Sequence, residues 1–328
     1  RVSRAAASPE VVVMSSPQSP TAEPRSAPPR ASAGLRPFAR LVAASDASEA
    51  AEGALRVAQG LAARDGASLV AVSVVEPVPY GMPVPDVAIA VPALPVADDA
   101  TLAARLRAVE AQCARVGPTG TTRVRVETAM PVQGILQVAA DVDAELVVLG
   151  IGRHGPLDRL FGSETALQVI RAAQRATLAV PPTMRELPQH AIVGMDFSDS
   201  ALAAARLAAR LVGPHGRITL VHVEPVGEPV PSMLSEWHGV YTEGVQAAFS
   251  RTIASLGLPH TLQVESVTLA GHAANALLGL VERSHADLVC LGRHSYGAIE
   301  RLLLGSVTTR VVRAASCAIA VAGPADAS

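Results

Sequence analysis

Short, continuous apolar runs alternate along this chain with segments in which apolar residues recur every three or four positions. Residues 69–75 and 146–149 are runs of the first kind, which are typical of parallel strands covered on both faces. Residues 51–62 and 204–212 have the second pattern, which predicts helices with one apolar face. Because the sequence has no hairpin turn of the Asn-Gly type, the alternation predicts βαβ units and a parallel sheet.

The same pattern occurs twice. Five segments recur in the same order, about 140–150 residues apart: 41–46 with 192–196, 74–77 with 222–225, 144–150 with 286–292, 159–163 with 301–306, and 178–180 with 319–321. We therefore predict a duplicated domain, with a first copy at 37–183, a second at 188–324 and a junction near 181–188. Each copy has room for about five strands and four helices, as in a doubly wound α/β fold.

The composition narrows the class of protein. Residues 1–36 are rich in Ser, Pro, Ala and Arg without a hydrophobic period, which predicts a disordered tail. The net charge of -2 and the 2% aromatic content give no basis for nucleic-acid binding. The sequence contains no run of about 18 apolar residues, so we predict no membrane span. Three scattered cysteines without a C-x-x-C pair favour a reducing compartment, the cytoplasm, over a disulfide framework or a zinc site.

All 27 basic residues are Arg, because the sequence contains no Lys. This excludes a phosphate loop of the G-x-x-x-x-G-K-[ST] kind, Schiff-base chemistry and a protein kinase. A nucleotide would have to be bound by backbone amides, hydroxyl groups and Arg.

The candidate chemistry lies after the fourth strand of the second copy. Gly292-Arg293-His294-Ser295 is followed, after nine residues, by Gly305-Ser306-Val307-Thr308 at a predicted helix start. Small residues and the amides of a helix N-terminus suit a phosphate group, and Arg293 or His294 would add charge. Alternatively, Ser306 is an ordinary helix cap. His222, at the end of the second strand, is interpreted as a hydrogen-bonded core or rim histidine rather than a ligand.

The spacing G-x2-[GS]-x9-G-S, in a repeat that opens with a strand and Asp, resembles the ATP-binding pattern G-x2-G-x9-G-[ST] of the universal stress protein family. The resemblance covers about residues 37–324, as two tandem copies. It implies an adenine nucleotide alpha-hydrolase-like α/β domain, a five-stranded parallel sheet with strand order 3-2-1-4-5. It also implies ATP binding with Mg²⁺, a role in the stress response, and a dimer formed within one chain or between two.

The family pattern carries over residue by residue. In the second copy it assigns Asp196 to the ribose or base and Val223 to the adenine pocket, although Ser295 replaces a glycine of the pattern. The remaining residues there are Leu291, Gly292, His294, Gly305, Ser306, Val307 and Thr308. The first-copy counterparts are Asp46, Val75, Gly150, Gly152, Gly155, Gly162, Ser163 and Thr165.

The first copy departs further from the pattern. Gly162 is 12 positions after Gly150, whereas Gly305 is 13 after Gly292, and Glu164 stands where the second copy has Val307. A carboxylate beside a phosphate site is unfavourable without a metal. We therefore expect the second copy to be the better preserved site.

Three functions compete. The first is a cytoplasmic, ATP-binding regulatory protein without strong catalysis, since no nucleophile–base pair, catalytic carboxylate pair or metal-ligand spacing stands out; slow ATP hydrolysis is compatible with it. The second is a nucleotide-free interaction protein with degenerate sites, signalling through dimer surfaces and the tail. The third, an ATP-pyrophosphatase, requires S-G-G-x-D-S after strand one, and residues 44–48 and 194–198 lack its glycine pair.

Overall fold

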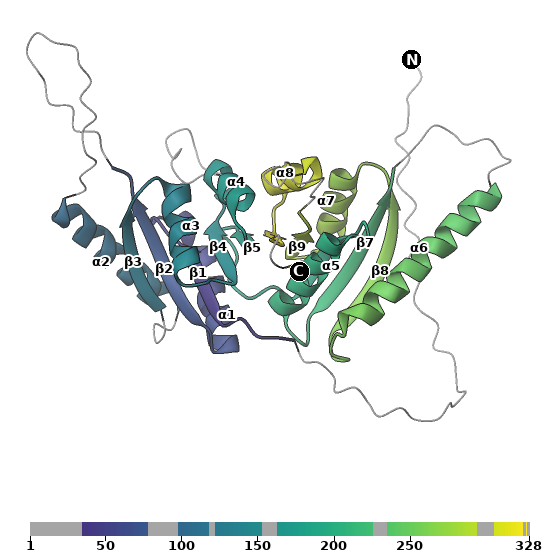
Figure 1. Cartoon of the computed structure of the whole chain (residues 1–328), viewed down its shortest axis with the longest axis horizontal. Helices are drawn as coiled ribbons and strands as arrows, with labels where there is room; N and C mark the ends of the chain where they lie inside the picture. The colour runs from purple at the N-terminus through teal and green to yellow at the C-terminus, as the bar shows by residue number, and fades with distance from the viewer. Residues whose placement is uncertain are drawn as a thin grey trace, which may run out of the picture. The chain divides into compact units, whose positions relative to one another are not determined.

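A computed structural model describes residues 35–77, 98–117, 122–152, 163–225, 235–293, 305–323 and 326. Among these, residues 37–187 form one compact unit, and residues 188–293 and 305–323 belong to a second. We call them the first and second units (Figure 1). The predicted tail lies outside the described residues, apart from residues 35 and 36.

The first unit is a parallel sheet covered by helices on both faces. Its strands are ordered β3-β2-β1-β4-β5, with α1 and α2 on one face and α3 and α4 on the other. Its elements are β1 (Arg40–Ala44), η1 (Glu49–Ala51), α1 (Glu52–Asp65), β2 (Ser68–Val75), α2 (Asp99–Val116), β3 (Thr122–Thr128), α3 (Pro131–Asp141), β4 (Leu146–Gly150), α4 (Ser163–Ala172) and β5 (Ala176–Val180).

The second unit has the same architecture. Its strands are ordered β8-β7-β6-β9-β10, and each pairs in parallel with its neighbour. Its elements are β6 (His190–Gly194), α5 (Asp199–Val212), β7 (Arg217–Glu224), α6 (Ser235–Leu256), β8 (Gln263–Ala270), α7 (Ala273–Ser284), β9 (Leu288–Leu291), α8 (Ser306–Ala314) and β10 (Ala318–Val321).

The predicted α/β fold and the strand order 3-2-1-4-5 are confirmed in both units. β4 and β9, which each lie between two other strands of their unit, are buried along almost their whole length, because helices cover both faces of the sheet; this is why they read as continuous apolar runs. The strand order reverses between β6 and β9 in the second unit, and a ligand site is expected there.

Helix ends follow local chemistry. The Ser198 side chain accepts a hydrogen bond from the Ala201 amide at the start of α5, and Asp98 caps α2 by accepting from Thr101, which satisfies amides that have no partner within the helix. In the described part of the chain, no helix combines the length and apolar character that crossing a membrane requires.

Candidate functional site

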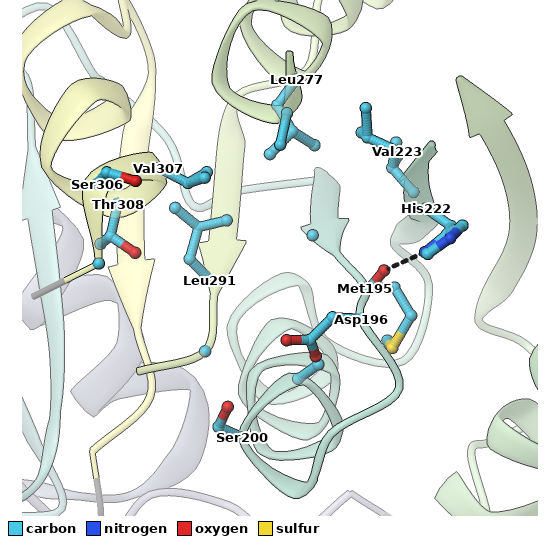
Figure 2. A pocket seen from close by; sticks show the side chains of 16 residues that line it. Met195, Asp196, Ser200, His222, Val223, Leu277, Leu291, Ser306, Val307 and Thr308 are labelled. Atoms are coloured by element: carbon cyan, nitrogen blue, oxygen red, sulfur yellow. Dashed lines mark hydrogen bonds between the residues drawn. The ribbon is translucent and has the colours of Figure 1, made fainter. Parts of the chain in front are cut away.

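The second unit has a pocket of about 210 Å³ at the carboxyl edge of its sheet. Its walls come from the ends of β6, β7 and β9 and from the starts of α5, α7 and α8. Figure 2 shows the α8 residues at one end of the pocket and His222 with Val223 at the other. The lining residues are Gly194, Met195, Asp196, Ser200, Ala201, Val221, His222, Val223, Ala273, Leu277, Leu291, Gly292, Gly305, Ser306, Val307 and Thr308.

The N-terminus of α8 forms one end of this pocket. Gly305 precedes the helix, and Ser306, Val307 and Thr308 lie in its first turn, which contains no acidic residue. The first amides of a helix have no partner within the helix and carry partial positive charge. Together with the Ser306 and Thr308 hydroxyl groups, they provide a donor-rich end that suits a phosphate.

Asp196 projects from the turn between β6 and α5 and is exposed. Its Oδ1 accepts hydrogen bonds from the Ser198 amide at 3.0 Å and from the Ser198 hydroxyl at 2.5 Å. The Ser198 hydroxyl in turn caps α5. These bonds hold the carboxylate at the pocket wall, where it can accept hydrogen bonds from a ligand's hydroxyl groups.

The wall between these polar groups is mostly aliphatic. Val223 comes from β7, Leu277 from α7 and Leu291 from β9, and Met195 and Ala273 extend the same surface. Leu277 and Leu291 are nearly buried, at 2% and 4% exposure. A few oriented polar groups around an apolar wall are the usual composition of a small-molecule site.

His222 is half-buried beside Val223. Its Nδ1 lies 2.8 Å from the carbonyl oxygen of Met195 (Figure 2), and its Nε2 lies 3.0 Å from the hydroxyl of Tyr241 on α6. The prediction that His222 is hydrogen-bonded is confirmed; it also lines the pocket.

At the equivalent place in the first unit, the described residues line a small hollow of about 30 Å³. Asp46, Gly150 and Thr165 line it. The Asp46 turn repeats the Asp196 turn, since Asp46 Oδ1 accepts from the Ser48 amide at 2.9 Å and from the Ser48 hydroxyl at 2.5 Å. The acidic turn is therefore present in both units, and the pocket that the described residues form beside it is much larger in the second unit.

Residues of α2 hold the first-unit turn. Gln112, which is fully buried, donates to the Ser48 carbonyl at 2.6 Å and accepts from the Ser45 hydroxyl at 2.5 Å. Arg105 donates to the Asp46 carbonyl at 2.6 Å. The first turn of α4 also contains Glu164, which opposes an anion at that helix end.

Strand register changes one predicted correspondence. Ala44 pairs with Val72 in the first unit and Gly194 with Val221 in the second. Counting two residues on, Val74 rather than Val75 is the counterpart of Val223. The sequence comparison is therefore shifted by one residue here. Val74 is 4% exposed and packs in the core between the sheet, α3 and α4.

The structure brings most of the predicted second-copy residues together. Asp196, Val223, Leu291, Gly292 and Gly305 to Thr308 all line one pocket, whereas His294 and Ser295 lie outside the described residues. Arg293 is 5% exposed and is not part of the lining. Burial lowers the pKa of its guanidinium, and the Asp326 carboxylate partly offsets that effect.

The first-copy candidates are less complete. Gly155 and Gly162 lie outside the described residues, and only the backbone of Ser163, at the start of α4, is described. Gly152 is buried and is not part of the small hollow. The second-unit residues that the sequence interpretation missed are Gly194, Met195, Ser200, Ala201, Val221, His222, Ala273 and Leu277. Proximity to Asp196 could have indicated Ser200, but nothing in the sequence indicates Leu277.

Comparisons with known proteins agree with this geometry. The sequence model of the universal stress protein family matches residues 37–181 and 188–323. A universal stress protein of Thermus aquaticus is 31% identical over 136 residues, which is 39% of this chain and 93% of that protein.

Two solved structures are also similar. One is a universal stress protein from Archaeoglobus fulgidus, with a TM-score of 0.56 and 16% identity, matched over 87% of this chain and 96% of that one. Another, a universal stress protein in complex with cAMP, matches 45% of this chain and 99% of its own, with 21% identity and a TM-score of 0.32.

Proposed function

The chain belongs to the universal stress protein family, and on that premise we propose that it binds ATP in the second-unit pocket and acts as a stress-response regulator without strong catalysis. The observation that carries the proposal is the arrangement of one pocket with a donor-rich helix end, an acidic turn and an aliphatic wall. An adenine nucleotide offers a matching phosphate, ribose and base.

The residues would divide the ligand between them. The α8 amides with Ser306 and Thr308 would hold phosphate oxygens by donating hydrogen bonds. Asp196 would accept from the ribose hydroxyl groups, and Val223, Leu277 and Leu291 would cover the base. Gly292, which has no Cβ, would let the ligand approach the backbone between these groups closely. Bound ATP would supply the charge and the Mg²⁺ affinity of its phosphates; among the described residues, no group of three His, Cys, Asp or Glu side chains could hold a metal.

The proposal assigns one nucleotide to each chain. The first-unit hollow of about 30 Å³ is too small for a base, the turn beside it is tied to α2, and Glu164 opposes a phosphate at α4. The first unit would then serve as a structural and interaction domain.

Equilibrium dialysis of the full chain against ATP and Mg²⁺ tests the proposal, with an expected stoichiometry near one per chain. Ser306→Tyr should abolish binding by filling the pocket mouth. Ser250→Tyr, the same change at an exposed position on α6, should leave it intact. No binding by the wild-type chain would sink the proposal. Mass spectrometry of ligand released from freshly purified protein would show whether ATP, ADP or another adenine nucleotide is retained.

The second candidate function is a nucleotide-free interaction protein, and the closed first-unit hollow favours it. It predicts partner binding that persists in the Ser306→Tyr variant. Self-association within one chain or between chains belongs to both candidates, and analytical ultracentrifugation with and without ATP separates these states. Residence in the cytoplasm is also part of the proposal, because the three cysteines are free and buried.

A further inference from the structure

The turn that carries Asp196 includes a residue in an unfavourable backbone conformation. Phe197, the next residue, has a φ of 64°, and Ala47 has the same φ in the first unit. A residue with a Cβ pays a steric penalty in this left-handed region. It persists there only when neighbouring contacts hold it, so what holds the turn also determines where Asp196 lies.

In the second unit, one imidazole contacts the turn on both sides of Asp196. The His222 Nδ1 meets the Met195 carbonyl at 2.8 Å, and the His222 ring packs on Phe197 with a centroid separation of 5.2 Å and a tilt of 35°. Phe249 also contacts Phe197 in an edge-on arrangement, with a centroid separation of 5.1 Å. The Met195 amide donates to Val221 at 2.8 Å, so the residue before Asp196 is bound through both its amide and its carbonyl.

The partners of His222 define its protonation pattern. A carbonyl oxygen only accepts hydrogen bonds, so Nδ1 carries the proton that bonds Met195. In the neutral ring, Nε2 is then the acceptor for the Tyr241 hydroxyl at 3.0 Å. Burial and the Glu224 carboxylate raise the pKa of the Tyr241 hydroxyl that donates this hydrogen bond. The imidazole is thereby oriented from α6.

The first unit holds its turn differently. Ser73 occupies the position of His222 by strand register; it is 1% exposed, and its hydroxyl has no hydrogen-bond partner among the described residues. Gln112 and Arg105 hold that turn from α2. In the second unit the imidazole that holds the turn also lines the pocket, whereas neither Gln112 nor Arg105 lines the first-unit hollow.

We infer that His222 is a positioning residue for nucleotide binding: it fixes the turn from Met195 to Phe197 so that Asp196 meets the ribose hydroxyl groups. This inference rests on the proposed function. Its distinctive consequence concerns the sugar, because displacement of Asp196 removes ribose recognition while the phosphate end at α8 is untouched.

The test compares the affinities of the full chain for ATP and for 2′,3′-dideoxy-ATP by calorimetry, both with Mg²⁺. The wild-type chain should prefer ATP by about tenfold, as expected for one good charge-assisted hydrogen bond. His222→Leu should remove this preference. His222→Asn should restore most of it, because its amide can donate from the place of Nδ1, whereas His222→Gln should not, because its amide reaches the place of Nε2.

Tyr241→Phe should reduce the preference partially, and His260→Asn, at an exposed histidine, should leave it unchanged. A general loosening of the pocket would weaken both ligands equally, so an unchanged ratio in His222→Leu overturns the inference while leaving the proposed function standing. Equal ratios in the Asn and Gln variants also overturn it, even if the Leu variant does not fold. Absence of ATP binding by the wild-type chain overturns both.

Discussion

A Cβ placed on Gly292 would lie 2.6 Å from the backbone carbon and oxygen of Ser200. The end of β9 therefore contacts the first turn of α5 so closely that only glycine fits. Gly150 has the same relationship to Ala50 in the first unit, at 2.7 Å from its carbonyl oxygen. The first glycine of the sequence motif thus has a packing requirement that is separate from ligand binding.

Gly292→Ala should lower the free energy of unfolding by about 1–3 kcal/mol, the usual cost of overpacking, because α5 or β9 must shift. Urea denaturation measures the change. Gly244→Ala is the matched control: it lies in α6 with no atom within 4 Å of its added Cβ, so it should be neutral or stabilising by about 0.5–1 kcal/mol. Equal stability of Gly292→Ala and the wild type would contradict the packing argument.

Asp196→Asn should weaken ATP binding by about tenfold, because an amide is a weaker acceptor than a carboxylate for ribose hydroxyl groups. The turn should persist, since the Asn oxygen can still accept from Ser198 as Asp196 does. Calorimetry provides the measurement. Asp46→Asn makes the same change in the first unit and should leave the affinity as it is; a comparable loss there would contradict the assignment of the site to the second unit.

Gln112→Ala should destabilise the protein by about 1–3 kcal/mol, because the buried Ser45 hydroxyl loses its acceptor and the Ser48 carbonyl keeps only the donor at Ala51. Urea denaturation of the variant checks this. Gln137→Ala removes an exposed side chain that bonds Asp141 and should cost much less. The affinity for ATP and the number of bound nucleotides should be the same in both variants. A second bound nucleotide in Gln112→Ala would mean that the contacts of α2 with the acidic turn are what prevent binding in the first unit.

Burial raises the pKa of Cys317 from 9.0 to about 12 and that of Cys290 well above its ordinary value. The unfolded chain therefore loses these thiol protons at lower pH than the folded chain does. This contribution to stability is complete below about pH 9 and falls as the pH rises towards 12. Urea denaturation across this range should show the decline, and Cys317→Ala should flatten it.

The same burial should protect the thiols in the folded protein. Ellman's reagent at pH 8 should react with Cys290 and Cys317 only after denaturant is added, because a thiolate is the reacting species. Rapid reaction in the native state would contradict their burial.

The hydrophobic pattern predicted the parallel α/β architecture correctly, because strands covered on both faces must be largely apolar; the strand order was an implication of the family resemblance. The chemistry of Asp196, Gly305, Ser306 and Thr308 could be interpreted from sequence because these residues lie at strand or helix ends, where the topology brings chain segments together. The predicted correspondence of Val75 with Val223 was wrong by one residue. It relied on the Glu-Pro dipeptide that follows each strand, and the strand pairing of the two units does not align these dipeptides.

Other features depend on contacts between distant segments. Gln112 bonds Ser48 from 64 positions away, and His222 meets Met195 across neighbouring strands. Leu277 reaches the pocket from α7. No spacing in the sequence encodes these contacts, since each depends on which helix face or strand edge is presented after the sheet has formed.

Ala47 and Phe197 share a φ of 64°, although one side chain is a methyl group and the other a phenyl ring. The two units thus hold a turn of the same conformation with different side chains and different supporting contacts. For protein engineering this makes the first unit a ready template: its acidic turn is already built, and redesign can concentrate on α2 and α4. A chain with two versions of one acidic turn can also change one of them without losing the other.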